Sequence, residues 1–229
     1  MSGSETRRAH PLPEARRARP LLGTLVEISA SSPGAEHAVA QAFRAVERVH
    51  ALMSYHDPAS DLSRLNREAA FRPVTVDEWT WQVLAAAREF SAASDGLFDV
   101  SVAPVLTRLG YLPRHADFPR ACPQADWRDI ELLAHSRVRF ARPLRADLGG
   151  IAKGFAVDRA VEALRASGVA SGRVNAGGDL RRFGAQAEAV HVRHPHAPTL
   201  LLPLAELGDG AAATSAGYFA PRQRDGRPI

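Results

Sequence analysis

Apolar residues in the first part of the chain follow the spacing of helices. Over residues 35–53 they recur every three or four positions, which predicts an amphipathic helix of about five turns. A serine and an aspartate in capping positions predict a short helical turn over 60–66 and a second long helix over 77–93. One strand is predicted before these helices, over residues 23–30, where β-branched residues precede a Ser-Ser-Pro-Gly break.

The later part of the chain is patterned mainly as strands. Residues 97–106 are predicted to be extended or irregular, and 112–128, with three prolines, to be a surface connection. Segments 138–140 and 145–148 predict a hairpin whose second strand runs into a glycine-rich turn and a helix over 153–167. Further strands are predicted over 171–176, 189–193, 199–204 and 212–215. Helices early and strands late, joined by one strand–helix–strand unit, predict an α+β fold.

The composition excludes several classes of protein. A chain of 229 residues with 45% hydrophobic and 24% charged residues is an ordinary globular protein, neither fibrous nor wholly disordered. Its one cysteine, Cys122, rules out an internal disulfide and a four-thiolate zinc or iron–sulfur site. No run of 18 apolar residues occurs, so no membrane span is predicted.

The positive charge is concentrated at the start of the chain. The net charge is +4, and residues 1–20 contain five arginines and two glutamates, so the remainder is nearly neutral. No basic stripe interleaved with aromatic residues is present, and nucleic acid is therefore not an expected partner. Residues 1–18 are predicted to be a disordered, Arg-rich leader. They lack the apolar core of a secretory signal, so the expected location is the cytoplasm.

The densest chemical information lies in the run Asp147-Leu-Gly-Gly-Ile-Ala-Lys153-Gly154. Two glycines let a ligand approach the backbone, and the N-terminus of the following helix favours an anion. Lys153 is unfavourable for the helix dipole there, and it is the single Lys among the 29 Lys and Arg residues. A bound phosphate would explain it, while a tight turn with an exposed amine is the alternative. The spacing excludes the nucleotide triphosphatase loop and the dinucleotide-binding glycine motif.

A second glycine pair, Gly177-Gly178, lies between Asn175 and Asp179. Alone, this sequence is typical of a hairpin turn. The alternative is that both glycine pairs flank one ligand, with Asp147 and Asp179 supplying oxygen atoms for a cation such as Mg²⁺ that bridges phosphates.

These two runs, residues 147–158 and 175–180, resemble the FAD:protein FMN transferase family, also called the thiamine biosynthesis lipoprotein ApbE family. Shorter matches occur in the family order at residues 22–24, 53–55, 63–66, 94–99 and 213–215, together with Pro104. The resemblance implies a T-fold-like mixture of helices and sheet, with one transferase domain over residues 19–229. Its helix-rich front is expected over about 19–130 and its strand-rich, FAD-binding back over about 131–229.

The resemblance also implies a reaction. Members bind FAD with Mg²⁺ and transfer the FMN moiety to a Thr or Ser hydroxyl of a target flavoprotein, releasing AMP. By matched motif, the residues implied to contact FAD are Leu22, Tyr55, Leu97, Phe98, Asp99, Asp147 and Lys153. Gly150 would offer its carbonyl oxygen to the metal. From the residues alone, Tyr55 either stacks on a ring system or belongs to the core.

The end of the chain departs from the family. A His-Ile-Ile-Asp-Pro-like stretch with a proposed catalytic histidine, and later Asp and Thr metal ligands, have no counterpart, so a C-terminally short member is expected and its catalytic residue is unknown. Two alternative functions follow: a non-catalytic flavin-binding remnant, or an FAD pyrophosphatase that releases FMN and AMP. Members are commonly exported, which makes the periplasm the alternative location.

Two clusters of basic side chains are candidates to replace the missing groups. His191, His194 and His196 are interpreted as parts of an exposed turn in preference to a metal site, because Pro195 interrupts them. The arginines at 181–182 and 222–224 are interpreted as solvated, with an arginine near the diphosphate as the alternative.

Overall fold

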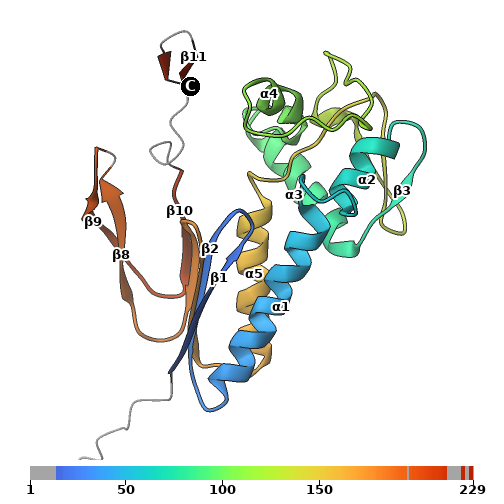
Figure 1. Ribbon diagram of the computed structural model, residues 1–229. Helices are drawn as coiled ribbons and strands as arrows, with labels where there is room; N and C mark the ends of the chain where they lie inside the picture. The colour runs from blue at the N-terminus through green and yellow to red at the C-terminus, as the bar shows by residue number, and fades with distance from the viewer. Residues whose placement is uncertain (1–13, 195, 216–222, 225–226, 229) are drawn as a thin grey trace, which may run out of the picture. The chain divides into compact units, whose positions relative to one another are not determined.

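A computed structural model describes residues 14–194, 196–215, 223–224 and 227–228 (Figure 1). Its contacts divide the chain into two compact units that alternate along the sequence. The sheet unit comprises residues 1–19, 25–43 and 160–229, and the helix-rich unit comprises residues 20–24 and 44–159. The predicted division at about residue 130 follows sequence order and remains a prediction.

The sheet unit is built around five strands in the order β1-β2-β6-β7-β10. The strands are β1 (Glu14–Leu21), β2 (Thr24–Ser31), β6 (Ser171–Ala176), β7 (Asp179–Phe183) and β10 (Gly210–Ala213). Pairing is antiparallel between β2 and β6, β6 and β7, and β7 and β10. The first part of α1 (Ala35–Met53) and the second part of α5 (Ala152–Ala166), from Ala160 onward, also belong to this unit. Buried apolar residues on both helices and on the strands form its core, among them Val26, Ile28, Val39, Phe43, Leu164 and Val174.

Two separate ribbons complete this unit. One pairs β8 (Glu188–His194) with β9 (Ala197–Leu207), and the other pairs β11 (Gln223–Arg224) with β12 (Arg227–Pro228). Four leucines of β9 are exposed: Leu200, Leu201, Leu202 and Leu204.

The helix-rich unit contains a small sheet and most of the short helices. Its helices are α2 (Asp61–Glu68), α3 (Glu78–Ala93), η1 (Val100–Val102), α4 (Ala103–Arg108) and η2 (Trp127–Asp129). Its sheet has the order β3-β5-β4, made by β3 (Val74–Thr75), β4 (Ile130–Leu133) and β5 (Arg137–Phe140). The buried carboxylate of Asp61 accepts hydrogen bonds from the amide of Asp77 at 2.7 Å and the hydroxyl of Thr80 at 2.9 Å. It thereby joins the start of α2 to the start of α3.

The α+β class is confirmed, together with the main helices. Residues 35–53 form α1, and the predicted caps are in place: Ser60 accepts from the amide of Ser63 and Asp77 accepts from the amide of Trp79. The helix predicted over 153–167 is α5, which begins one residue earlier at Ala152. None of the helices within the described ranges is long and apolar enough to cross a membrane.

Several local predictions are wrong. Residues 14–18, placed in the disordered leader, belong to β1; residues 1–13 lie outside the described part. Residues 145–148 form no strand, because β5 pairs with β4 and β3 instead. Most of the segment 97–106, predicted to be extended or irregular, is helical in η1 and α4.

The strand β7 was not predicted because it contains two arginines. Arg182, interpreted as solvated, is 9% exposed and donates to Glu188 Oε2 at 3.2 Å and to the carbonyl of Gly208 at 3.3 Å. These acceptors replace water around its guanidinium, which allows a charged residue to lie inside the unit. The arginine at 222 lies outside the described residues.

Candidate functional site

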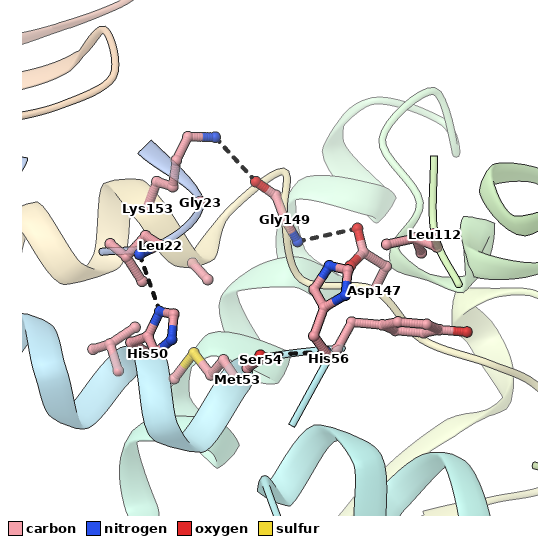
Figure 2. A pocket seen from close by; sticks show the side chains of 13 residues that line it. Leu22, Gly23, His50, Met53, Ser54, His56, Leu112, Asp147, Gly149 and Lys153 are labelled. Atoms are coloured by element: carbon pink, nitrogen blue, oxygen red, sulfur yellow. Dashed lines mark hydrogen bonds between the residues drawn. The ribbon is translucent and has the colours of Figure 1, made fainter. Parts of the chain in front are cut away.

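One pocket gathers several of the predicted site residues inside the helix-rich unit. Of the seven residues implied to contact FAD, four line it: Leu22, Tyr55, Asp147 and Lys153. They come from the turn before β2, the loop after α1, the segment before α5 and the first turn of α5. Figure 2 shows side chains from these separate segments around one space. Residues far apart in the sequence are thus brought together at one pocket, and their implied contacts with FAD remain predictions.

The glycine-rich turn is held by a chain of hydrogen bonds. The amide of Asp147 donates to the carbonyl of Val100 at 2.8 Å, which fixes the start of the turn. Asp147 Oδ2 accepts from the amide of Gly149 at 3.2 Å, and Lys153 Nζ donates to the carbonyl of Gly149 at 3.3 Å (Figure 2). The turn therefore presents a carboxylate and an ammonium group to the same pocket.

Both glycines of the turn lie against neighbouring side chains. A Cβ at Gly149 would stand 3.0 Å from Asp147 Oδ2, and a Cβ at Gly150 would stand 3.3 Å from Cε2 of Phe98. Neither residue has a positive φ, so a larger side chain at either position would be opposed by these contacts and not by the backbone conformation.

The environment of Asp147 alters its acidity. Burial raises the pKa of the Asp147 carboxyl above its ordinary value. The hydrogen bond from the amide of Gly149 and the positive charge of His56 and Lys153 act in the opposite direction, and they lower the same pKa. Figure 2 shows the imidazole of His56 beside this carboxylate. Burial is the largest of these effects, so the pKa of Asp147 stays above its ordinary value.

Tyr55 belongs to the core and also lines the pocket. It lines the pocket, yet it is 3% exposed and packs edge-on against the rings of His115 and Phe118, with centroids 5.2 and 5.7 Å apart. Its buried hydroxyl has no hydrogen-bond partner among the described residues. Tyr55 is therefore a core residue with one part facing the pocket.

The other three predicted residues are not among those that line the pocket. Leu97 is 93% exposed. Phe98 contacts the Gly150 position and the ring of Phe90, 6.2 Å away. Asp99 caps η1, because its carboxylate accepts from the amide of Ser101 at 2.7 Å. Their implied contacts with FAD remain predictions.

The second glycine pair forms the predicted turn, between β6 and β7 in the sheet unit. Gly177 and Gly178 have φ values of 63° and 103°, and the amide of Gly178 donates to Asn175 Oδ1 at 3.0 Å. The carbonyl of Gly178 accepts from the amide of Thr214 at 3.1 Å. The matched segments at 175–180 and 213–215 are thus in direct contact.

The metal expected from the resemblance finds few ligands. Within the part of the chain that the structure describes, no group of three His, Cys, Asp or Glu side chains is suited to hold a metal ion. Asp147 supplies one carboxylate, and the adjoining Gly150 would supply one backbone carbonyl. These oxygens alone do not make a Mg²⁺ site, which takes six ligands in an octahedron. Two of the three histidines near Pro195 contact each other in the ribbon β8–β9, where Nδ1 of His194 accepts a hydrogen bond from the amide of His196 at 3.2 Å.

Two histidines of the pocket were not predicted. His50, in the last turn of α1, accepts a hydrogen bond from the amide of Leu22 through Nδ1 at 3.0 Å. His56 follows in a loop where the hydroxyl oxygen of Ser54 accepts from the amides of His56 and Asp57, each at 3.2 Å. Their position beside the matched segment 53–55 is the sequence signal that would have pointed to them.

Comparison with known proteins identifies similar sequences. A sequence model described as the ApbE family matches residues 22–227. A Treponema pallidum protein named FAD:protein FMN transferase is 28% identical over 93% of this chain and 67% of its own length. A Vibrio cholerae protein of the same name is 28% identical over 80% of this chain and 59% of its own length.

Solved structures show the same fold. The ApbE protein of Thermotoga maritima matches 94% of this chain and 74% of its own chain, with 26% identity and a TM-score of 0.82. The flavinyl transferase ApbE of Pseudomonas stutzeri, in its apo form, matches with 23% identity over 96% of this chain and 74% of its own, with a TM-score of 0.81. The curated Vibrio cholerae relative is longer than this chain, which spans 59% of its length. Because the family model matches residues 22–227, the chain belongs to the ApbE family.

Proposed function

We propose that the chain transfers the FMN moiety of FAD to a Thr or Ser hydroxyl of a target flavoprotein and releases AMP. One observation carries this proposal. A single pocket is lined by four residues that lie far apart in the sequence: Leu22, Tyr55, Asp147 and Lys153. Family membership and the printed name of the relatives, FAD:protein FMN transferase, give further support.

The reaction breaks a diphosphate, and the pocket offers groups suited to that step. The acceptor oxygen forms a bond to the phosphorus of the FMN moiety, the bond between that phosphorus and the bridging oxygen breaks, and AMP leaves with the bridging oxygen. The hydroxyl proton passes to a base that we do not assign. Stabilising the charge on the phosphates is the main demand of such a transfer.

Lys153 is the residue that meets this demand. Its ammonium lies on a flexible stem and hydrogen-bonds to the carbonyl of Gly149 at 3.3 Å, a long contact that a phosphate oxygen can replace. The N-terminus of α5 adds the positive end of its helix dipole. Asp147, beside Lys153, orients the turn through the amide of Gly149.

Dependence on Mg²⁺ is part of the proposal, although the described residues do not complete a site for the ion. Asp147 and the carbonyl of Gly150 are the donors nearest the turn, and phosphate oxygens and water commonly supply the other ligands of Mg²⁺. No step is derived through the ion. Activity measured with Mg²⁺ and with a chelator tests this part separately.

The experiment measures AMP after the purified chain is mixed with FAD and Mg²⁺, with and without an acceptor flavoprotein. Transfer predicts AMP only when the acceptor is present, with covalent FMN on the acceptor. We expect Lys153→Ala to lower the rate about 10²-fold, because it removes a charge that stabilises the transition state. Arg72→Ala is the matched control, since Arg72 forms an exposed ion pair with Glu68 in the same unit.

Two results would contradict the proposal and identify the alternatives. AMP released equally without the acceptor would show an FAD pyrophosphatase. FAD that binds without any AMP release would show a non-catalytic flavin-binding protein. A rate unchanged in Lys153→Ala would remove Lys153 from the mechanism even if transfer occurs.

A further inference from the structure

The wall of the pocket contains a turn whose conformation is unfavourable for its sequence. Leu22 and Gly23 join β1 to β2, and their φ values are 55° and 71°. A two-residue hairpin turn with two positive φ values favours Asn, Asp or Gly at both positions. A leucine in the left-handed region is uncommon and destabilises the turn. Another interaction is therefore needed to hold Leu22 in this conformation.

His50 supplies this interaction. The amide of Leu22 donates to Nδ1 of His50 at 3.0 Å (Figure 2). In a hairpin turn of this kind the hydrogen bond that closes the turn joins the residues on either side, so the amide of the first turn residue needs a partner elsewhere. Leu22, Gly23 and His50 all line the pocket and belong to the helix-rich unit. The bond thus joins two segments of one pocket wall.

The same bond fixes the form of the imidazole. An amide can only donate, so Nδ1 of His50 must be the accepting nitrogen. In the neutral ring the proton then lies on Nε2. The two ring nitrogens have different tasks, and each can be replaced separately by a side-chain amide.

We propose that His50 is a positioning residue that holds the Leu22–Gly23 turn in the shape that binds FAD. It acts through Leu22 and not by contact with the ligand. The inference rests on the proposed function only in taking FAD as the ligand. Strained residues at a binding site commonly keep a side chain where the ligand needs it, and here that side chain is Leu22.

Three substitutions at one position test the proposal. In His50→Asn the amide oxygen stands close to the place of Nδ1, so the bond to Leu22 is kept. In His50→Gln the amide stands close to the place of Nε2, and in His50→Ala both nitrogens are lost. We expect FAD affinity to fall about 2- to 10-fold in the Ala and Gln variants, the effect of one hydrogen bond, and to change less than about 2-fold in the Asn variant.

The control and the kinetic readout separate positioning from chemistry. His37→Ala removes another exposed histidine of α1, which pairs with Gln41 and does not line the pocket, and its FAD affinity should be unchanged. A positioning role in binding predicts a higher KM for FAD in His50→Ala with nearly the same kcat. A fall in kcat with unchanged KM would overturn it.

A measurement without ligand keeps the inference independent of the proposed function. Hydrogen exchange of the Leu22 amide, followed by NMR, should be faster in His50→Ala and His50→Gln than in the wild type and near the wild-type rate in His50→Asn. Unchanged exchange in His50→Ala would overturn the proposal even if FAD binds. Retained affinity in Gln with loss in Asn would show that Nε2 contacts the ligand directly, which also overturns it.

Discussion

The side chain of Asn66 is bound to the backbone of Ala146 by two hydrogen bonds. Asn66 Nδ2 donates to the carbonyl of Ala146 at 2.9 Å, and the amide of Ala146 donates to Asn66 Oδ1 at 2.7 Å. Both residues are buried. Because Asp147 follows directly, an amide on α2 fixes the backbone at the entrance to the glycine-rich turn. The matched segment 63–66 thus acts on the site through the backbone.

Asn66→Ala should destabilise the fold. The substitution leaves an amide and a carbonyl of Ala146 buried without partners, which costs about 2–4 kcal/mol in the free energy of unfolding. Urea denaturation measures this change. Gln82→Ala is the control, because it removes an amide that bonds to Glu78 on the exposed face of α3, and its effect should stay below about 0.5 kcal/mol. Equal effects in the two variants would contradict the role given to Asn66.

Asp147→Asn should change the pH dependence of stability. Burial raises the pKa of Asp147 in the folded state, so folding favours the protonated carboxyl. The resulting stability is complete below the unfolded pKa and is lost as pH rises through the folded pKa. The asparagine still accepts from the amide of Gly149 and carries no charge. We therefore expect the variant to be at least as stable as the wild type at neutral pH.

The same variant should bind FAD more weakly, about 10-fold, because a charged hydrogen-bonding group is replaced by a neutral one. Thermal unfolding and FAD titration across acidic and neutral pH measure both effects. A variant that is less stable than the wild type at neutral pH would show that the carboxylate stabilises the fold, contrary to this prediction.

Asp129 should contribute to stability in the opposite direction of pH. Burial alone would raise its pKa, but hydrogen bonds from Arg142, at 2.7 and 2.8 Å, and from the amide of Asp126 lower it overall. The stabilisation is present above the unfolded pKa and is lost as pH falls through the folded pKa. Arg142→Ala should therefore destabilise the fold at neutral pH and have little effect at strongly acidic pH. A pH-independent effect in urea titrations would speak against the ion pair as its cause.

Gly178 and Gly154 should respond oppositely to alanine. At Gly178, φ is 103° and a Cβ would overlap the hydroxyl of Thr214, so Gly178→Ala should lower the free energy of unfolding by about 1–3 kcal/mol. At Gly154, within α5, nothing lies within 4 Å of the added Cβ. Gly154→Ala should raise the free energy of unfolding by about 0.5–1 kcal/mol. Calorimetry of the two variants checks both signs.

Elements with strong local signals were predictable. The helices α1 and α3 begin and end where periodicity and capping residues placed them, because these signals depend only on neighbouring residues. The partner of β5 was missed, although only three residues separate β4 from β5, because the sequence Ile-Glu-Leu-Leu of β4 carries a single β-branched residue; the hairpin with 145–148 was therefore wrong. Strand β1 was missed because its arginines suggested disorder, although the edge of a sheet accepts charged residues.

Part of the candidate site could be selected from sequence motifs, although the contacts with FAD that the motifs imply stay predictions. The family motifs selected Leu22, Tyr55, Asp147 and Lys153, and the fold brings them to one pocket. No motif pointed to His50, because its contact with Leu22 arises only when the end of α1 reaches the turn before β2. Asn66 was matched, but its partner Ala146 could not be named without the tertiary structure.

The single lysine of the chain makes the pocket chemically addressable. Lys153 lines the pocket, so apart from the α-amine any amine-directed reagent can acylate only that site. Intact mass spectrometry then reads occupancy directly, because a ligand that covers the ammonium shields it from the label. A lysine-specific protease likewise has one target bond, after Lys153 in the first turn of α5, and its rate of cleavage reports how often that turn opens.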